Sequence, residues 1–331
     1  MTIQEPPRED VSARPLWSVM IPTFNCAIYL REALVSVLRQ DQGPDIMQIE
    51  VVDDCSDRDD PEAVVRELGS GRVEFHRQPR NVGHTVNFAT CLQRARGRLI
   101  HQLHGDDRVQ DGFYKAMQRA FEQNQDIGAA FCRHGFIDAE GKQFNVSDLE
   151  RPESGVLDGW VEKIAVRQHI QTPSMVVRRD VYEKLGGFDA RVGAMEDWEM
   201  WVRIAVNYPV WYEVNPLALY RVHGNSSTSR YVRTGENIRD ARRAIEVMHS
   251  YLPLEVRDEL RSKALEHWAR CAINIYARDL IESGHTIPAV RQLMEGLRCN
   301  HSIKSIKDFL YMLKFMGVKQ MDRYCKRRSS D

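Results

Sequence analysis

Short apolar runs alternate with amphipathic stretches along the first hundred residues of the chain. The short runs are bounded by polar or turn-forming residues, as expected of buried strands, and the longer stretches place apolar residues at helical spacing. The strand-like runs are residues 17–21, 49–52, 73–76 and the run that begins at Leu99, and the helical stretches are residues 27–40, 61–68 and 87–96. Strands that alternate with helices and end in polar residues predict a mostly parallel α/β sheet.

The rest of the chain is less regular at first and then becomes helical throughout. We expect helices over residues 113–124 and 196–206, and another that follows a strand over 175–177 and ends at Leu185. A further strand is expected over 129–137, followed by a hairpin turn at 138–141. A hydroxyl-rich loop is expected to begin at Tyr220. From about Arg233 onward the pattern is helical, and residues 265–282 and 287–298 predict a helical hairpin that turns at Ser283 and Gly284.

These patterns divide the chain into three parts. Residues 1–16 are polar and contain prolines, which predicts a flexible leader. Residues 17–230 form the predicted α/β domain, with a first half to about residue 108 and a second half over 109–230. Residues 231–331 form a C-terminal helical region.

Composition describes an ordinary globular protein and excludes several classes of function. The formal net charge of −1 gives no reason to expect a nucleic-acid partner. The seven cysteines are scattered and form no Cys-x-x-Cys pair, so neither a zinc site nor a disulfide framework is indicated. With no signal peptide and no apolar run of the roughly 18 residues that span a bilayer, we expect a cytoplasmic protein.

Two adjacent carboxylates, Asp106 and Asp107, follow the strand that begins at Leu99. The carboxyl ends of strands are where α/β sheets bind their ligands. Neighbouring carboxylates repel each other, so they are stable in water or beside a cation. Mg²⁺ and Mn²⁺ suit such a pair, because they take a few carboxylates and complete their shell with phosphates and water. A solvated turn is the alternative interpretation.

Five motifs in order resemble those of the family 2 glycosyltransferases, which are inverting enzymes with the GT-A fold. The similarity covers roughly residues 17–229 and leaves the helical region outside. The motifs are residues 19–25 (Val-Met-Ile-Pro-Thr-Phe-Asn), 50–57 with its paired acids, 105–107 (Gly-Asp-Asp), 186–201 with Glu-Asp-Trp, and 220–223 (Tyr-Arg-Val-His).

The resemblance implies a catalytic domain over 17–230 that transfers a sugar from a nucleotide-diphosphate donor to a glycan or lipid-linked acceptor, in polysaccharide or glycolipid biosynthesis. It implies Mn²⁺ or Mg²⁺ on Asp107, with Asp106 as a ligand or a donor contact. His223 is a tentative further ligand. The donor-binding residues implied by the same motifs are Pro22, Thr23, Phe24, Asn25, Asp54, Asn81, Gly83 and Asp106.

The roles that the resemblance implies for Asp54 and for the catalytic base each have a chemical reason. Asp54 accepting a base N–H would favour uracil or thymine over cytosine. Asp197 is the candidate general base, with Glu196 as the alternative, since transfer to an alcohol requires a group that takes the hydroxyl proton. Acids are also common in a first helical turn because of the helix dipole. Arg108 stands where the family often has a small residue, and would crowd or neutralise the acids.

The basic C-terminus allows two interpretations. Apolar residues recur at helical spacing and are accompanied by lysines and arginines. In the first interpretation, the helix packs on the catalytic domain and its basic end is solvated. In the second, it contacts an anionic membrane surface, where lipid-linked acceptors would be found. The apolar positions are Ile303, Ile306, Phe309, Leu310, Leu313 and Met316.

Two other functions share features with this sequence. A sugar nucleotidyltransferase has a similar α/β layout, but it would want a glycine-rich basic loop where residues 22–25 stand. A non-catalytic sugar-nucleotide-binding or scaffold protein would use the helical region to recruit partners.

Overall fold

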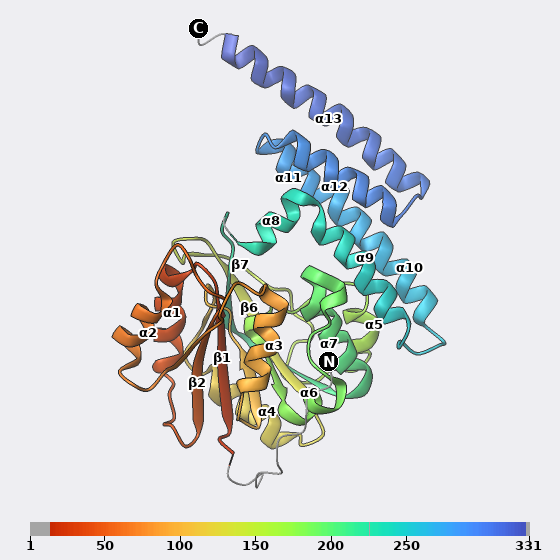
Figure 1. The fold of residues 1–331 in the computed structure, drawn as a ribbon. Coiled ribbons are helices and arrows are strands. Elements are labelled where there is room, and N and C mark those ends of the chain that lie inside the picture. The colour runs from red at the N-terminus through yellow and green to blue at the C-terminus, as the bar shows by residue number, and fades with distance from the viewer. Residues whose placement is uncertain (1–13, 225, 329–331) are drawn as a thin grey trace. The chain divides into compact units, whose positions relative to one another are not determined.

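The computed structural model describes residues 14–224 and 226–328, with side chains described as far as residue 323. Most of the predicted leader, residues 1–16, lies outside the described residues. The architecture is mixed α/β, with one large sheet, flanking helices and a set of C-terminal helices (Figure 1). Within the described part of the chain, no helix is both long and apolar enough to cross a membrane.

The first half of the sheet is parallel, as the alternating pattern predicts. Its strands lie in the order β3-β2-β1-β4, and β1 pairs in parallel with both β2 and β4. The strands are β1 (Trp17–Thr23), β2 (Met47–Asp53), β3 (Glu74–Arg77) and β4 (Leu99–Gln102), and the helices between them are α1 (Ala27–Leu38), α2 (Pro61–Gly69) and α3 (His84–Arg94).

The second half of the sheet is mixed, within a sheet whose paired residues are mostly parallel, as expected. Strand β9 pairs antiparallel with both β4 and β6, whereas β6 and β10 are parallel to each other. The chain between β6 and β9 carries two short strands and irregular segments, so β9 can enter from the opposite edge. The strands here are β5 (Arg108–Val109), β6 (Ala129–Ile137), β7 (Gln143–Val146), β8 (Gly155–Val156), β9 (Met175–Arg178) and β10 (Val210–Arg221).

Strand β10 includes Tyr220 and Arg221, the first two residues of the loop that the sequence predicted from Tyr220, and ends at Arg221. It contains Pro216, and its register against β6 shifts on both sides of that residue. Proline removes a backbone donor and is tolerated in a strand at such a bulge. The predicted hairpin turn is confirmed, because the antiparallel strands β6 and β7 flank residues 138–141 and Gly141 has a φ of +82°.

A continuous apolar core lies on one face of the sheet. Trp17, Val19 and Ile21 of β1 pack with residues of α1, α2 and α4 (Phe113–Gln123). The alternation of side chains along β1 therefore directs every second residue into this core. Helix α3 contacts β1 and β2 and contributes no residue to this core cluster. The helices that remain before residue 210 are α5 (Trp160–Ile164), α6 (Arg179–Leu185) and α7 (Glu196–Asn207).

The chain forms two compact units. The first comprises residues up to 160, 168–190 and 200–222, and the second comprises 161–167, 191–199 and 223 onward. The expected boundary after residue 230 falls inside α8. The helices of the second unit include α8 (Ser227–Thr234), α9 (Glu236–His249), α10 (Arg257–Arg270), a π-helical segment (Cys271–Tyr276), α11 (Ala277–Glu282), α12 (Thr286–Cys299) and α13 (Ile303–Arg328).

Within the second unit, the predicted helical hairpin is present. The chain reverses between α11 and α12 at Gly284, where φ is +87°. Helix α13 packs one face, including Phe309 and Met312, on an apolar cluster formed with α11 and α12.

Candidate active site

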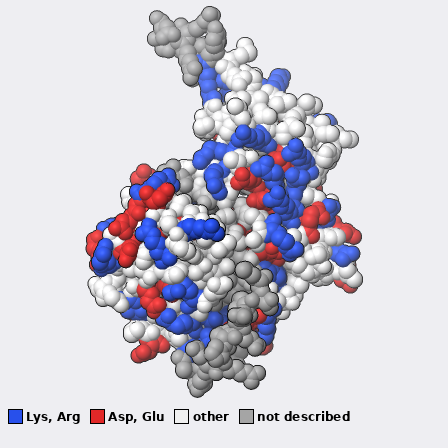
Figure 2. Space-filling model, in the orientation of Figure 1, with Lys and Arg blue, Asp and Glu red and all other residues white. Residues whose placement is uncertain are grey.

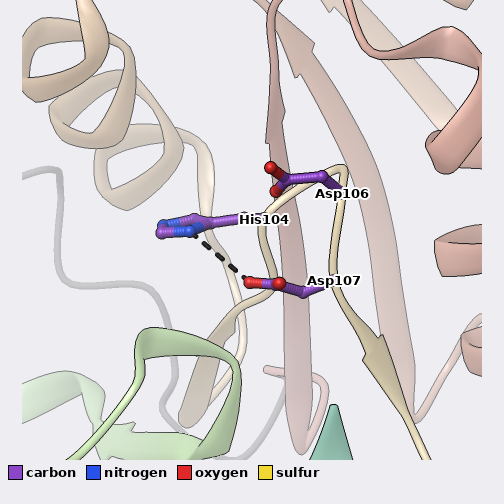
Figure 3. A group of neighbouring side chains, drawn as sticks. All are labelled: His104, Asp106 and Asp107. Carbon is purple, nitrogen blue, oxygen red and sulfur yellow. Dashed lines mark ion pairs between the residues drawn. The ribbon is translucent and has the colours of Figure 1, made fainter. Parts of the chain in front are cut away.

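Three potential metal ligands meet in the turn that follows β4. One nitrogen of His104 and one carboxylate oxygen each from Asp106 and Asp107 all lie within 4.8 Å of one another. Figure 3 shows the two carboxylates directed toward the side of the turn on which the imidazole lies, and His104 Nδ1 is 3.7 Å from Asp107 Oδ2. The adjacent acids of the sequence are therefore joined by a histidine that stands just before them.

The end of β1 shapes this turn. Gly105 donates its backbone N–H to the carbonyl of Pro22 at 3.0 Å, and Asp107 donates to the carbonyl of His104 at 3.0 Å. A Cβ on Gly105 would lie 2.9 Å from Cys26 Sγ and 3.0 Å from Thr23 Oγ1, so only glycine fits this close approach. Residues 22–26 therefore pack against Gly105, in the turn that carries the acids.

Arg221, at the end of β10, donates hydrogen bonds to both acidic residues. Its backbone N–H donates to Asp107 Oδ1 at 2.8 Å, and its Nε donates to the main-chain carbonyl of Asp106 at 2.8 Å. The fully buried guanidinium also donates to the carbonyls of Asp138 and Ala139 and to Glu32 Oε2. One side chain therefore links the acids, the β6–β7 turn and α1.

Arg108 points away from the acids. Its Nη1 donates to Glu32 Oε2 at 2.7 Å and its Nη2 donates to the carbonyl of Gly141 at 2.9 Å. The expectation that Arg108 would crowd or neutralise the acids is therefore wrong. Asp107 lies just before β5, and Arg108 is its first residue, so the hydrogen bonds of Arg108 to Glu32 and Gly141 fix its side chain separately from the acids.

The electrostatics of the turn favour a divalent cation. Burial, followed by the charge of Asp106, raises the pKa of Asp107 well above its ordinary value, and burial lowers the pKa of His104. Asp107 Oδ2 and His104 Nε2 are buried, and neither has a hydrogen-bond partner among the described residues. A neutral imidazole and carboxylate oxygens are the donor set that a bound Mn²⁺ or Mg²⁺ accepts, so the residues present fit such an ion.

The predicted donor-binding turn after β1 contains one exposed aromatic ring. Phe24 is 42% exposed, so its ring is not part of the core. Pro22 and Thr23 are buried, and Asn25 adopts a φ of +51°. The Asn25 amide oxygen accepts the N–H groups of Asp57 and Arg58, each at 3.0 Å. These three residues therefore build the turn that presents Phe24.

Asp54 organises the loop before α3. Its two carboxylate oxygens accept the backbone N–H of Val82 at 2.7 Å and of Gly83 at 3.0 Å. Burial raises the pKa of this carboxyl despite these two donors. Asn81 is exposed in the same loop, and Gly83, with a φ of +84°, begins α3. Asp54 thus fixes the predicted donor loop through its backbone.

The remaining predicted residues belong to the second unit. Glu196 and Asp197 form the first turn of α7, where Glu196 is buried and Asp197 is half-buried. Asp197 Oδ1 accepts the backbone N–H of Trp198 at 2.6 Å. His223 also belongs to this unit, and its role as a metal ligand stays a prediction.

Sequence reasoning missed His104 and Glu32 as parts of this site, and it noted Arg221 only as a member of the motif over residues 220–223, without its contacts to the acids. His104 stands two residues before Asp106, and that short spacing at a strand end is the signal that could have identified it. Arg221 and Glu32 lie far from the acids in sequence and gave no such signal.

Comparisons with known proteins identify the family of the chain. Residues 18–186 match the family model described as Glycosyl transferase family 2. A Mycobacterium tuberculosis protein, MT1568, is 30% identical over 247 residues, covering 70% of this chain and 75% of its own length. A Methanocaldococcus jannaschii protein named as a glycosyltransferase, MJ1057, is 27% identical over 59% of this chain and 66% of its own length.

Solved structures share the fold over nearly the whole chain. Staphylococcus aureus TarS 1–349 in complex with UDP-GlcNAc has a TM-score of 0.64 and 15% identity, covering 93% of this chain and 91% of that one. The Pyrobaculum calidifontis mannosyltransferase PcManGT in complex with GDP-Man and Mn²⁺ has a TM-score of 0.58 and 18% identity, covering 96% and 91%. From the family model and the relatives, we conclude that the chain belongs to glycosyltransferase family 2 and is a glycosyl-transferring enzyme.

Proposed function

We propose that the protein transfers a sugar from a nucleotide-diphosphate donor to a hydroxyl of a glycan or lipid-linked acceptor, with inversion at the anomeric carbon. The group formed by His104, Asp106 and Asp107 at the carboxyl end of β4 carries this proposal. The sugar nucleotidyltransferase alternative has no support from the family assignment. A non-catalytic scaffold would not need two adjacent potential ligand atoms, Asp107 Oδ2 and His104 Nε2, that are buried without a hydrogen-bond partner among the described residues.

The metal-binding group would act on the diphosphate side of the reaction. Asp107 Oδ2, His104 and Asp106 would hold Mn²⁺ or Mg²⁺, which supplies Lewis-acid stabilisation of the charge that grows on the leaving diphosphate. The protein's contribution is to orient Asp107, which Arg221 does by donating its backbone N–H to the other carboxylate oxygen. The carboxylate thereby keeps one oxygen for the cation.

Asp197 would act on the acceptor side. It takes the proton of the attacking hydroxyl as the new glycosidic bond forms and the bond to the diphosphate breaks. Because the oxygen attacks from the face opposite the diphosphate, no covalent sugar intermediate on the protein is required and the anomeric configuration inverts.

The favoured donors are UDP- and dTDP-sugars. Ionised carboxylate oxygens have more than one acceptor position each, so Asp54 can accept a base N–H in addition to the backbone of Val82 and Gly83. The exposed ring of Phe24 offers a stacking surface for the base. TarS is described with UDP-GlcNAc and PcManGT with GDP-Man, so both nucleotides belong in any donor panel.

Calorimetry with Mn²⁺ and a panel of UDP-, dTDP- and GDP-sugars tests this function. Asp107→Ala should remove measurable Mn²⁺ binding and Mn²⁺-dependent hydrolysis of the donor. Asp111→Ala is the matched control, because this exposed acid lies on the same segment outside the ligand group. Unchanged Mn²⁺ affinity in Asp107→Ala would contradict the metal assignment, and strongest competition by GDP would contradict the role of Asp54.

We also propose that α13 brings the enzyme to an anionic membrane surface. Opposite its packed face, α13 exposes apolar side chains at helical spacing, including Ile303 (74% exposed), Leu310 (58%) and Met321 (70%). Lys307 and Lys314 are exposed beside them. Figure 2 shows uncharged surface interspersed with Lys and Arg over the C-terminal helices. Apolar side chains flanked by lysines are typical of helices that lie in a membrane interface.

Vesicle sedimentation at low salt tests this contact. Leu310→Glu should reduce binding to phosphatidylglycerol vesicles without changing donor hydrolysis, because the new charge opposes both insertion and the anionic surface. Ile275→Glu on the π-helical segment is the control for an exposed apolar residue elsewhere. Equal binding by the wild type and Leu310→Glu would leave only the packing role of α13.

A further inference from the structure

The segment over residues 191–199, which carries Glu196 and Asp197, groups with the C-terminal helices rather than with the sheet. Its entry is a kink at Gly193, where φ is +56° and ψ is −121°. L-residues rarely adopt this conformation, so the turn that leads into α7 depends on glycine.

A buried carboxylate on α9 occupies the space beside this kink. Asp240 Oδ2 accepts the backbone N–H of Ala194 at 3.0 Å. A Cβ on Gly193 would lie 2.3 Å from the same oxygen and 2.7 Å from Asp240 Cγ. The missing side chain therefore lets the carboxylate approach the backbone three residues before Glu196. Arg243 donates to Asp240 Oδ1 at 2.9 Å, which orients the carboxylate from the solvent side.

Other residues of the second unit fix the chain that follows Glu196 and Asp197. Trp198 is fully buried, donates its Nε1–H to the carbonyl of Ile164 at 2.6 Å, and packs on Trp268 of α10 with ring centroids 5.3 Å apart. Tyr251 donates its hydroxyl to Glu199 Oε1 at 2.9 Å. Asp197 is thus bracketed by contacts on both sides, all from within the second unit.

We propose that Asp240 is a positioning residue for glycosyl transfer, which sets the backbone of the Gly193–Ala194 turn and through it the orientation of Asp197. This proposal rests on the role of Asp197 in the proposed function. It assigns the C-terminal helices a part in catalysis, in addition to any contact with a membrane. Gly193 is its structural counterpart, because any larger residue would displace the carboxylate.

Hydrogen exchange on the full chain tests the structural half of the proposal without requiring activity. Asp240→Ala removes the acceptor for the Ala194 N–H and should raise deuterium uptake in peptides covering 191–199. Asp240→Asn keeps one acceptor oxygen and should raise it less. Asp258→Ala is the matched control, since its exposed carboxylate pairs with His249 at 2.6 Å and touches no part of this segment. Uptake in 191–199 that is equal in Asp240→Ala and wild type would overturn the proposal.

Kinetics test the catalytic half, using Mn²⁺-dependent hydrolysis of UDP-GlcNAc and GDP-mannose. A misplaced base costs turnover and spares donor binding, so kcat should fall about 10-fold to 100-fold in Asp240→Ala. The donor KM and the Mn²⁺ Kd should stay within about twofold, and Asp240→Asn should recover part of the loss. An unchanged kcat, or an equal loss in Asp258→Ala, would overturn the proposal. If Asp197→Asn itself retained full turnover while 191–199 loosened in Asp240→Ala, the proposed function would fail and the positioning of the segment would stand.

Discussion

The two segments that carry the proposed catalytic acids are fixed by side chains of opposite charge. The turn at residues 104–107 is fixed by the buried cation of Arg221, and the segment at 191–199 by the buried carboxylate of Asp240. In the first, the groups to be fixed are a carboxylate and backbone carbonyls, which need donors. In the second, the group to be fixed is a backbone N–H at a kink, which needs an acceptor. The charge of each positioning residue follows from what it must bind.

The two segments also differ in what their positioning residues contact. The side chain of Arg221 donates to three carbonyls and one carboxylate, so it joins α1, the β6–β7 turn and the acids. Asp240 accepts the backbone N–H of Ala194, and Trp198 and Tyr251 fix the residues that follow. We therefore expect the metal turn, which one buried side chain joins to α1 and to the β6–β7 turn, to resist deformation more than the segment before α7.

The largest effect on turnover should come from Asp197→Asn. The amide keeps the shape of the side chain and cannot take a proton, so turnover should fall about 10²-fold to 10⁴-fold. Donor and Mn²⁺ affinities, measured by calorimetry, should be unchanged. Glu196→Gln is the neighbouring control and should be milder. Near-normal transfer by Asp197→Asn, or a product that retains the donor's anomeric configuration, would refute the assignment.

Arg221→Met should give the largest effect on stability. It leaves the carbonyls of Asp106, Asp138 and Ala139 without their donor, and the loss in unfolding free energy should be about 2–5 kcal/mol. Urea denaturation measures this loss, and Mn²⁺ calorimetry should show at least about tenfold weaker binding because Asp107 is no longer oriented.

Arg108→Met is the matched control for Arg221→Met. Arg108 shares Glu32 as a partner and donates its other hydrogen bond to the carbonyl of Gly141, so its loss should leave Mn²⁺ affinity nearly intact. An equal loss of Mn²⁺ affinity in the two variants would show that the charge near Glu32, rather than the contacts of Arg221, sets the metal turn.

The local sequence pattern was sufficient to predict most helices and strands and the pair Asp106–Asp107, because these features depend on residues that are neighbours in the sequence. Alternation and helical spacing predicted β6 over 129–137 and α4 over 113–124, and the structure places them at Ala129–Ile137 and Phe113–Gln123. Strand β10 was not predicted because Pro216 interrupts its pattern of apolar and polar residues. The direction of β9 was not predicted because it depends on the edge of the sheet from which the chain enters.

The positioning residues had no local signal. Arg221 contacts Asp107 across 114 positions, and Asp240 contacts Ala194 across 46. No spacing rule connects such residues, because folding alone brings them together. Arg108 illustrates the reverse case: sequence proximity to the acids suggested contact, and the side chain instead donates to Glu32 and to the carbonyl of Gly141.

Stability without metal should fall as pH rises through the titration of Asp107. Its pKa is raised in the folded state, so the stabilising contribution of the protonated form is complete below the unfolded pKa and is lost above it. Mn²⁺ requires the ionised carboxylate, so the rise in melting temperature caused by Mn²⁺ should be larger at pH 8 than at pH 5.5. Thermal scans with and without Mn²⁺ measure it. Asp107→Asn should abolish this pH dependence, and its persistence there would assign the effect to another group.

Glu32→Gln should have the smallest effect and separates charge from hydrogen bonding at Arg221. One oxygen of Glu32, Oε2, accepts from both Arg221 at 2.8 Å and Arg108 at 2.7 Å. Glutamine keeps one acceptor oxygen and loses the charge, and Glu32 is partly exposed, so solvent screens that charge. The loss of unfolding free energy should therefore be about 0.5–1 kcal/mol. Mn²⁺ affinity should change less than about twofold, since the bonds from Arg221 to Asp106 and Asp107 do not involve Glu32. If Glu32→Gln instead weakened Mn²⁺ binding as much as Arg221→Met, the orientation of Asp107 would depend on the charge balance of the Glu32–Arg221 pair. The contrast with Asp240, which accepts the backbone N–H of Ala194, would then rest on charge rather than on which groups each residue contacts.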